Sequence, residues 1–142
     1  EMKFIDAVAA VMNRRMETDP SVVVMGEDVH RLNGGTNGAT RGLPSRFPGR
    51  VLGTPIAENA MTGVALGAAL SGLRPIHVHL RVDFMLAAMD QIVNHAARLR
   101  NRHLGFVFQS FHQGVEGEYS QIDIATGTHG HSVRVPLLIA NN

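Results

Sequence analysis

The sequence lacks the features that mark several specialised classes of protein. It contains no cysteine, which excludes a disulfide framework and is typical of a cytoplasmic protein, the location we expect. The formal net charge of +1 gives no reason to expect a nucleic-acid partner or an anionic membrane surface. The longest uncharged stretch, residues 59–73, is too short to cross a bilayer, and no basic start followed by an apolar core marks a signal peptide.

The residues that are present predict one globular domain over residues 1–142. Hydrophobic residues make up 44% of the chain and charged residues 18%, which excludes an intrinsically disordered protein. A chain of 142 residues is close to the commonest size of a single domain. Such a chain buries enough apolar surface to fold without a disulfide or a structural metal.

Helical and strand-like patterns alternate along the chain. This alternation predicts an α/β fold with a mainly parallel sheet covered by helices on both faces, a three-layer α/β/α arrangement. The predicted helices cover residues 2–16, 43–47, 57–73 and 83–100, and the predicted strands cover 22–25, 50–54, 76–80 and 133–140, with a weaker strand candidate at 106–108. The expected inner residues are Phe4, Val8, Val11, Met12 and Met16 on the first helix, and Met85, Met89, Ile92, Val93 and Ala96 on the last.

Glu58 is the most informative residue, because it begins the most apolar predicted helix. Every other residue from 57 to 73 is small, apolar or uncharged, and a carboxylate that enters such a helix is costly unless something binds it. The dipole at the helix N-terminus offsets part of that cost. Two interpretations stay open: a glutamate that only caps the helix, or a carboxylate in a low-dielectric pocket that exchanges a proton with a ligand.

Five motifs within residues 2–100 together resemble one known family. The motifs are Val23-Val24-Met25-Gly26-Glu27-Asp28, Thr54-Pro55-Ile56-Ala57-Glu58, Gly72-Leu73-Arg74-Pro75-Ile76, Asp83-Phe84 and Asp90-Gln91-Ile92-Val93-Asn94. They resemble the beta subunit of the thiamine-diphosphate-dependent decarboxylating component of 2-oxo acid dehydrogenase complexes, of which the pyruvate, branched-chain and acetoin enzymes are members. Residues 58–67 also fit the Glu-x4-Gly-hydrophobic-x-x-Gly pattern of the pyrimidine-binding domains of thiamine-diphosphate enzymes.

The resemblance implies a cofactor site for thiamine diphosphate, with Glu58 as the catalytic residue. The matching glutamate hydrogen-bonds a ring nitrogen of the aminopyrimidine, which favours the imino tautomer that removes the thiazolium proton. Phe84 matches an aromatic residue that packs on the pyrimidine ring, with a core phenylalanine as the alternative. Glu27 matches an acidic residue near the pocket, with a solvated acid at a strand end as the alternative. Ile56 and Ala57 are expected to line the pocket.

The sequence departs from the family pattern in three ways. It has no Gly-Asp-Gly motif followed by paired asparagines, which in this superfamily holds magnesium and diphosphate and belongs to the alpha subunit. We therefore expect only the pyrimidine half of the cofactor site here, with a homo-oligomer or an alpha-type subunit as partner. Family beta subunits are longer, so the domain is expected to be partial or shortened. Residues 101–132 replace a shorter family loop, and 133–140 resemble the next core strand; Tyr119-Ser120-Gln121 offers a second register, with that strand at Phe106.

Two further groups of residues have open roles. A helix without a polar face needs cover on all sides, so we expect Gly63 and Gly67 to lie at a subunit interface, although ordinary tight packing also uses glycine. His77 and His79 are two residues apart on a predicted strand and share one face. With no cysteine and no identifiable third ligand, they indicate ordinary packing or surface histidines rather than a metal site.

These observations support two hypotheses about function. In the first, the chain is a beta-type pyrimidine-binding domain of a 2-oxo acid dehydrogenase, and Glu58 activates the cofactor for oxidative decarboxylation once a partner is present; the isolated chain is expected to be inactive. In the second, the chain is a non-catalytic binding or assembly module that keeps the fold and the interface without the activity. The intact motif around Glu58 favours the first, and the replaced 101–132 segment favours the second.

Overall fold

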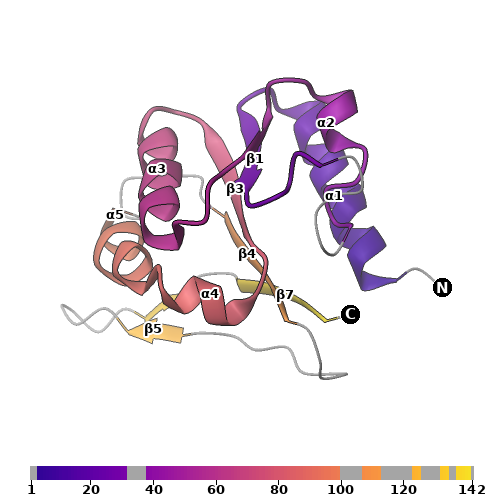
Figure 1. The fold of residues 1–142 in the computed structure, drawn as a ribbon. Helices are drawn as coiled ribbons and strands as arrows, with labels where there is room; N and C mark the ends of the chain where they lie inside the picture. The colour runs from indigo at the N-terminus through magenta and orange to yellow at the C-terminus, as the bar shows by residue number, and fades with distance from the viewer. Residues whose placement is uncertain are drawn as a thin grey trace.

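A parallel five-stranded sheet forms the centre of the computed structural model, which describes residues 3–31, 38–99, 107–112, 123–125, 132–134 and 137–141 (Figure 1). The strand order is β2-β1-β3-β4-β7, and every neighbouring pair is parallel. A separate antiparallel pair consists of β5 and β6. The strands are β1 Val22–Gly26, β2 Val51–Gly53, β3 Arg74–His79, β4 Val107–His112, β5 Asp123–Ala125, β6 Ser132–Arg134 and β7 Leu137–Asn141.

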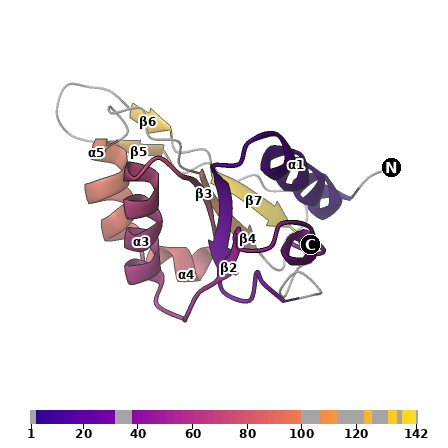
Figure 2. The same ribbon diagram turned by 90° about the horizontal axis from the view of Figure 1, so that it is seen from above.

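Helices cover both faces of this sheet, so the predicted three-layer α/β/α class is confirmed. Helices α1 and α2 lie on one face, and α3, α4 and α5 lie on the other (Figure 2). The helices are α1 Phe4–Thr18, α2 Leu43–Arg46, α3 Glu58–Leu70, α4 Val82–Leu86, the π-helix η1 Gln91–Ala96 and α5 Ala97–Leu99.

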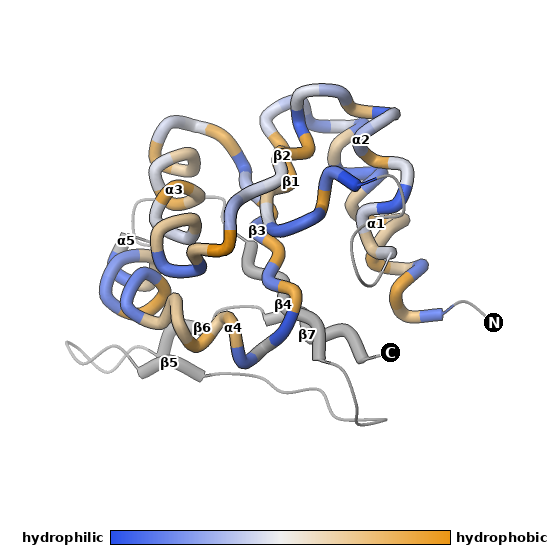
Figure 3. The backbone as a smooth tube through the Cα atoms, in the orientation of Figure 1, coloured by the Kyte–Doolittle hydropathy of each residue, from blue (hydrophilic) through white to orange (hydrophobic). Residues whose placement is uncertain are grey.

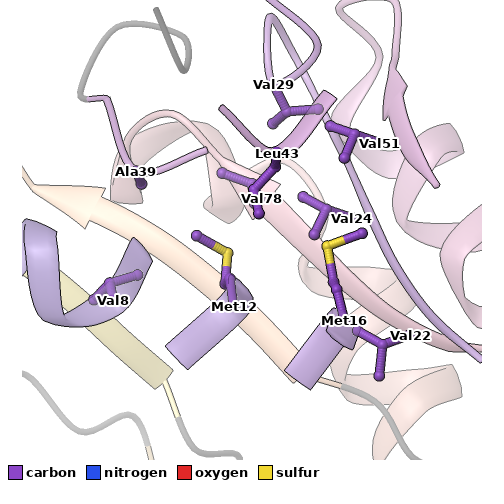
Figure 4. Close-up of a cluster of buried hydrophobic side chains, with 10 residues drawn as sticks. All are labelled: Val8, Met12, Met16, Val22, Val24, Val29, Ala39, Leu43, Val51 and Val78. Atoms are coloured by element: carbon purple, nitrogen blue, oxygen red, sulfur yellow. The ribbon is translucent and has the colours of Figure 1, made fainter. Parts of the chain in front are cut away.

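Each face of the sheet has its own apolar core. On the α1 side, Met12 and Met16 point toward Val24 of β1 and Val78 of β3 (Figure 4). On the other side, the five residues predicted for the inner face of the last helix all belong to a second cluster. Met85 and Ile92 are buried there together with Ala88, and Met89, Val93 and Ala96 pack against them. All five residues of β1 are buried, as expected for a strand with a neighbour on each side and a helical layer on each face.

Val11 does not belong to the inner face of α1, and its prediction was wrong. Val8, Met12 and Met16 are four residues apart and form one line along the helix that faces the sheet, whereas the Val11 side chain is 60% exposed. Val11 follows Val8 by three residues and Met12 follows it by four, and both spacings are typical of one face of a helix. Only the packing of α1 on the sheet decides which of these side chains is buried.

Two predicted elements are divided in the structure. The single helix expected over 83–100 consists of α4, a turn, the π-helix η1 and α5. The side chains predicted for the inner face are nevertheless buried or partly buried in one cluster. The strand expected over 133–140 is divided into β6 and β7, and the strand beside β3 is instead β4, the weaker candidate. Tyr119-Ser120-Gln121 lies outside the described residues.

Candidate functional site

The carboxyl ends of β1, β2 and β3 meet along one edge of the sheet, because the three strands are parallel neighbours. Glu27 directly follows β1, and α3 begins with Glu58 after the short connection from β2. Phe84 lies on α4, which follows β3. Sheets of this kind bind ligands outside the carboxyl ends of their strands. The fold therefore brings the predicted site residues to the edge where a ligand site is expected.

Two close contacts hold the connections at this edge together. The backbone N–H of Thr54 donates a hydrogen bond of 2.9 Å to the carbonyl of Gly26, which joins the residues after β2 to the end of β1. The imidazole of His30 lies directly against Gly53, in the space that a Cβ would occupy. A side chain larger than hydrogen at position 53 therefore displaces His30. Glu27 and Glu58 leave the sheet from these fixed ends.

Glu27 and Glu58 are close enough to interact electrostatically. Partial burial raises the pKa of Glu27 above its usual range, and the negative charge of Glu58 adds to this, followed by that of Asp28. A nearby negative charge makes a carboxyl group retain its proton to a higher pH. Glu27 therefore holds its proton more readily than a free glutamate does, at the edge where the site is expected.

The Glu58 carboxylate is half-buried and accepts no hydrogen bond from the described part of the chain. It also forms no ion pair there, although it stands in the first turn of a helix whose later turns are apolar (Figure 3). Ala57 at the N-cap position provides no side-chain hydrogen bond to the helix. Among the described residues, the carboxylate is therefore available to an N–H donor from a ligand.

Apolar side chains are exposed on the segments that follow β2 and β3. Ile56, two residues before Glu58, is 80% exposed, and Phe84 is 38% exposed and belongs to neither core cluster. The Arg81 guanidinium lies 5.5 Å from the centroid of the Phe84 ring. Exposed apolar surface of this kind costs free energy unless something covers it. A flat heterocycle is one group that such side chains can contact.

The two strand histidines are buried behind this edge. Their rings meet edge-on with centroids 4.5 Å apart, and the Nδ1 of His77 lies 3.3 Å from the carbonyl oxygen of Met25. The Nε2 of His79 lies 3.5 Å from the Oγ1 of Thr62 on α3. Burial lowers the pKa of His77 to about 4 and that of His79 to about 3, the latter helped by the neighbouring ring. Both imidazoles are therefore neutral near pH 7.

The two glycines expected at an interface differ in their surroundings. A Cβ on Gly63 would lie 3.4 Å from the Oε1 of Gln91, so Gly63 packs against η1 of the same chain. A Cβ on Gly67 would meet nothing within 4 Å. Val64 and Leu70 are more than half exposed. The single chain therefore leaves one side of α3 uncovered, and the expected cover by a subunit interface stays a prediction.

Among the described residues, no group of three or more histidine, aspartate or glutamate side chains is placed to hold a metal ion. No helix in that part of the chain has the length and apolar character needed to span a membrane.

Comparison with known proteins assigns the chain to a family. The sequence profile of "Transketolase, pyrimidine binding domain" matches residues 1–121, which is more than half of the chain. The chain belongs to this family. The pyrimidine-binding domain defined by the profile includes α1 to α5 and β1 to β4, and so contains every predicted site residue.

The pyrimidine-binding domain is similar to several named subunits. It is 46% identical over 102 residues to the 2-oxoisovalerate dehydrogenase subunit beta of Bacillus subtilis (strain 168), a match that covers 71% of this chain and 31% of that protein. It is 36% identical over 146 residues to the pyruvate dehydrogenase E1 component subunit beta-2, mitochondrial, of Oryza sativa subsp. japonica, covering 96% and 39%. The chain therefore spans about a third of the length of these relatives.

A solved structure confirms the fold of the domain. The structure described as "Split gene transketolase, inactive beta4 tetramer" superposes with a TM-score of 0.61 at 21% identity, over 76% of this chain and 33% of that one. At this identity the likeness concerns the fold alone. The resemblance to the beta subunits of 2-oxo acid dehydrogenases, taken from the motifs, is confirmed by the sequence relatives.

The residues present fit the pyrimidine end of thiamine diphosphate. Glu58 offers a carboxylate without a protein partner among the described residues, and Ile56 and Phe84 are exposed apolar side chains that follow β2 and β3 at the same edge. Sequence reasoning did not find the contact between Thr62 and His79. The sequence shows that Thr62 shares a helix face with Glu58, because it follows Glu58 by one turn. It does not show the contact with His79, which lies on a strand 17 residues further along the chain.

Proposed function

We propose that the chain forms the pyrimidine side of a thiamine diphosphate site in a 2-oxo acid dehydrogenase assembly. The observation that carries this proposal is the half-buried Glu58 carboxylate, which stands without a described partner beside Glu27 at the carboxyl edge of the sheet. The bound cofactor would supply the nucleophilic carbon that cleaves the bond between the carboxylate and carbonyl of a 2-oxo acid.

Glu58 would accept a hydrogen bond from the ring nitrogen of the aminopyrimidine and thereby hold a proton at that nitrogen. Its place in the first turn of α3 puts the carboxylate at the N-terminal end of the helix, where the helix dipole favours negative charge. The negative charge of Glu27 would add to that of Glu58, and this favours a protonated ring nitrogen on the ligand beside Glu58. Ile56 and Phe84 would contact the ring and keep water from that hydrogen bond.

A partner subunit would complete the site. The sequence contains no Gly-Asp-Gly motif, so we assign the diphosphate and magnesium to an alpha-type subunit. The exposed apolar residues of α3, which include Val64 and Leu70, and the uncovered Gly67 would lie at an interface with that subunit or with a second copy. The rice relative is named as mitochondrial, so a cytoplasmic location for this chain stays a prediction.

The proposal is tested by calorimetry with thiamine diphosphate and Mg²⁺, using the full chain alone and in complex with an alpha-type subunit. We expect no heat of binding from the chain alone and binding from the complex. Glu58→Ala and Glu58→Gln should abolish turnover of a 2-oxo acid and leave assembly unchanged. Glu17→Gln on α1 is the matched control, because its carboxylate is exposed and pairs with Arg46 far from the edge. Turnover that survives both Glu58 substitutions would overturn the proposed role.

A second function is favoured by the uncovered face of α3. A chain that uses Val64, Gly67 and Leu70 only to assemble would need no cofactor chemistry. This assembly module predicts a stable oligomer or complex that binds no thiamine diphosphate. Sizing of the purified chain by analytical ultracentrifugation, followed by calorimetry on the assembled species, separates the two functions.

A further inference from the structure

Thr62 follows Glu58 by one turn of α3 and therefore lies on the same face of the helix. Its side chain is fully buried, and its Oγ1 lies 3.5 Å from the Nε2 of His79. His79 is the last residue of β3 and is 4% exposed. The turn of α3 that carries Glu58 is thus attached to the end of a central strand by a contact between two buried polar side chains.

Further contacts lead from His79 to β1, the strand that ends directly before Glu27. The His77 ring meets the His79 ring edge-on, at an angle of 71°. A carbonyl oxygen only accepts hydrogen bonds, so His77 uses Nδ1–H to donate to the oxygen of Met25. Met25 lies on β1, two residues before Glu27. The Thr62–His79 contact, the contact between the two rings and the His77–Met25 hydrogen bond therefore connect the helix of Glu58 with the strand that ends directly before Glu27.

Without a further contact, the first turn of α3 would hold Glu58 only weakly against the repulsion from Glu27. The apolar contacts of α3 are non-directional, so burial by itself favours no single position of the helix end along the sheet. A hydrogen bond is directional, and a buried one is costly to break because both groups stay away from water. Repulsion between Glu27 and Glu58 pushes in the direction of separation, so a directional contact close to Glu58 has the largest effect on their spacing.

We propose that Thr62 and His79 are positioning residues that fix the Glu58 end of α3 against the sheet and hold the Glu58 carboxylate beside Glu27. This inference rests on the proposed function of Glu58 and adds the residues that set its place. Neither residue touches the ligand in this scheme. They act on Glu58 through the backbone of α3, because Thr62 and Glu58 are one helical turn apart.

The test is the titration of Glu27 in the full chain, followed by the ¹³C chemical shift of its carboxyl group in glutamate-labelled protein. Glu58→Gln is the reference and lowers the Glu27 midpoint by removing the neighbouring charge. Thr62→Val removes only the hydroxyl and should lower the midpoint in the same direction by about 0.3 pH units or more, which is about twofold in proton affinity. Thr62→Ser keeps the hydroxyl and should retain the wild-type midpoint.

Thr40→Val is the matched control. The Thr40 side chain is equally buried, and its hydroxyl donates to the carbonyl of Val29 at 2.9 Å within the other core cluster. This control reports the general effect of losing a buried threonine hydroxyl and should leave the Glu27 midpoint unchanged. His79→Leu provides the second route to the same result should Thr62→Val fail to fold.

The outcomes separate this inference from the proposed function. A Glu27 midpoint that stays at the wild-type value in Thr62→Val or His79→Leu, while Glu58→Gln lowers it, overturns the positioning role. Equal shifts in Thr62→Val and Thr40→Val overturn it as well. The proposed function is judged separately by turnover of the Glu58 variants in the complex, which does not depend on Thr62.

Discussion

Gly26 ends β1 with its α-carbon against the carbonyl group of Val78 on β3, so that no Cβ fits between them. Its φ of +157° is also a conformation that other residues rarely adopt. The next residue is Glu27, so this close approach of two strands determines the point at which the acidic residue leaves the sheet.

Gly26→Ala should therefore destabilise the fold and displace Glu27. We expect a loss of about 2 kcal/mol in the free energy of unfolding, measured by urea denaturation, because the collision is with backbone and cannot relax by rotating a side chain. Gly49→Ala is the matched control, since its φ is +79° but nothing lies within 4 Å of the added Cβ. A Gly26→Ala variant no less stable than Gly49→Ala would contradict the close approach.

Acid should destabilise the protein through its buried histidines. Burial lowers the pKa of His77 to about 4 and of His79 to about 3, below the ordinary 6.5, so their contribution to stability is complete above pH 6.5 and is lost as the pH falls toward 4. The expected loss is roughly 2 kcal/mol per histidine between pH 7 and pH 5, from about 1.4 kcal/mol per pH unit below 6.5.

The source of the acid sensitivity is tested by substitution. His77→Leu should flatten the dependence of unfolding free energy on pH in urea denaturation between pH 5 and 7. His95→Leu should leave it unchanged, because the His95 side chain is about half exposed. Equal slopes for the wild type and His77→Leu would show that other groups cause the effect.

Gly67→Ala should have opposite effects on the single chain and on its assembly. Alanine is the better helix former by roughly 0.5–1 kcal/mol, and nothing obstructs its Cβ, so the urea midpoint of the chain should rise. If the proposed interface packs closely at Gly67, the methyl group weakens association by about tenfold, as followed by sedimentation equilibrium. Gly63→Ala should stabilise less, because its Cβ meets Gln91. Unchanged association would place the interface elsewhere.

Arg50 should contribute more to stability than a surface arginine does. Its guanidinium donates to the carbonyls of Met16, Asp19 and Val22 at the end of α1 and the start of β1. Arg50→Ala should cost about 2 kcal/mol in thermal or urea unfolding, because it leaves partly buried carbonyls without donors. Arg46→Ala removes an exposed ion pair with Glu17 and should cost less than about 1 kcal/mol. Similar losses in both variants would argue against this role of Arg50.

The sequence was sufficient for the features that depend on local pattern. The β-branched run at 22–25 and the alternation at 76–80 predicted two strands, and Glu58 was correctly placed at the start of an apolar helix. These predictions succeed because periodicity and burial are coupled within a single element. The motif resemblance added the family.

Features that depend on contacts between distant elements were not predictable in the same way. Met25, Thr62 and the two histidines come from three separate elements, and no local pattern links them. Val11 was misplaced, because composition does not show which side of a helix meets its neighbours. The order of β4 and β7 was also open, since both segments have the apolar character of a sheet strand.

The short connections at the carboxyl edge have a consequence for how such a domain can change over generations. The core of the sheet is formed by residues such as Val24 and Val78, whereas Glu27, Ile56 and Phe84 all stand after a strand has ended. A mutation in one connection therefore alters one wall of the binding region and leaves the packing of the layers intact. Selection can refine the chemistry of this region one loop at a time on an unaltered frame.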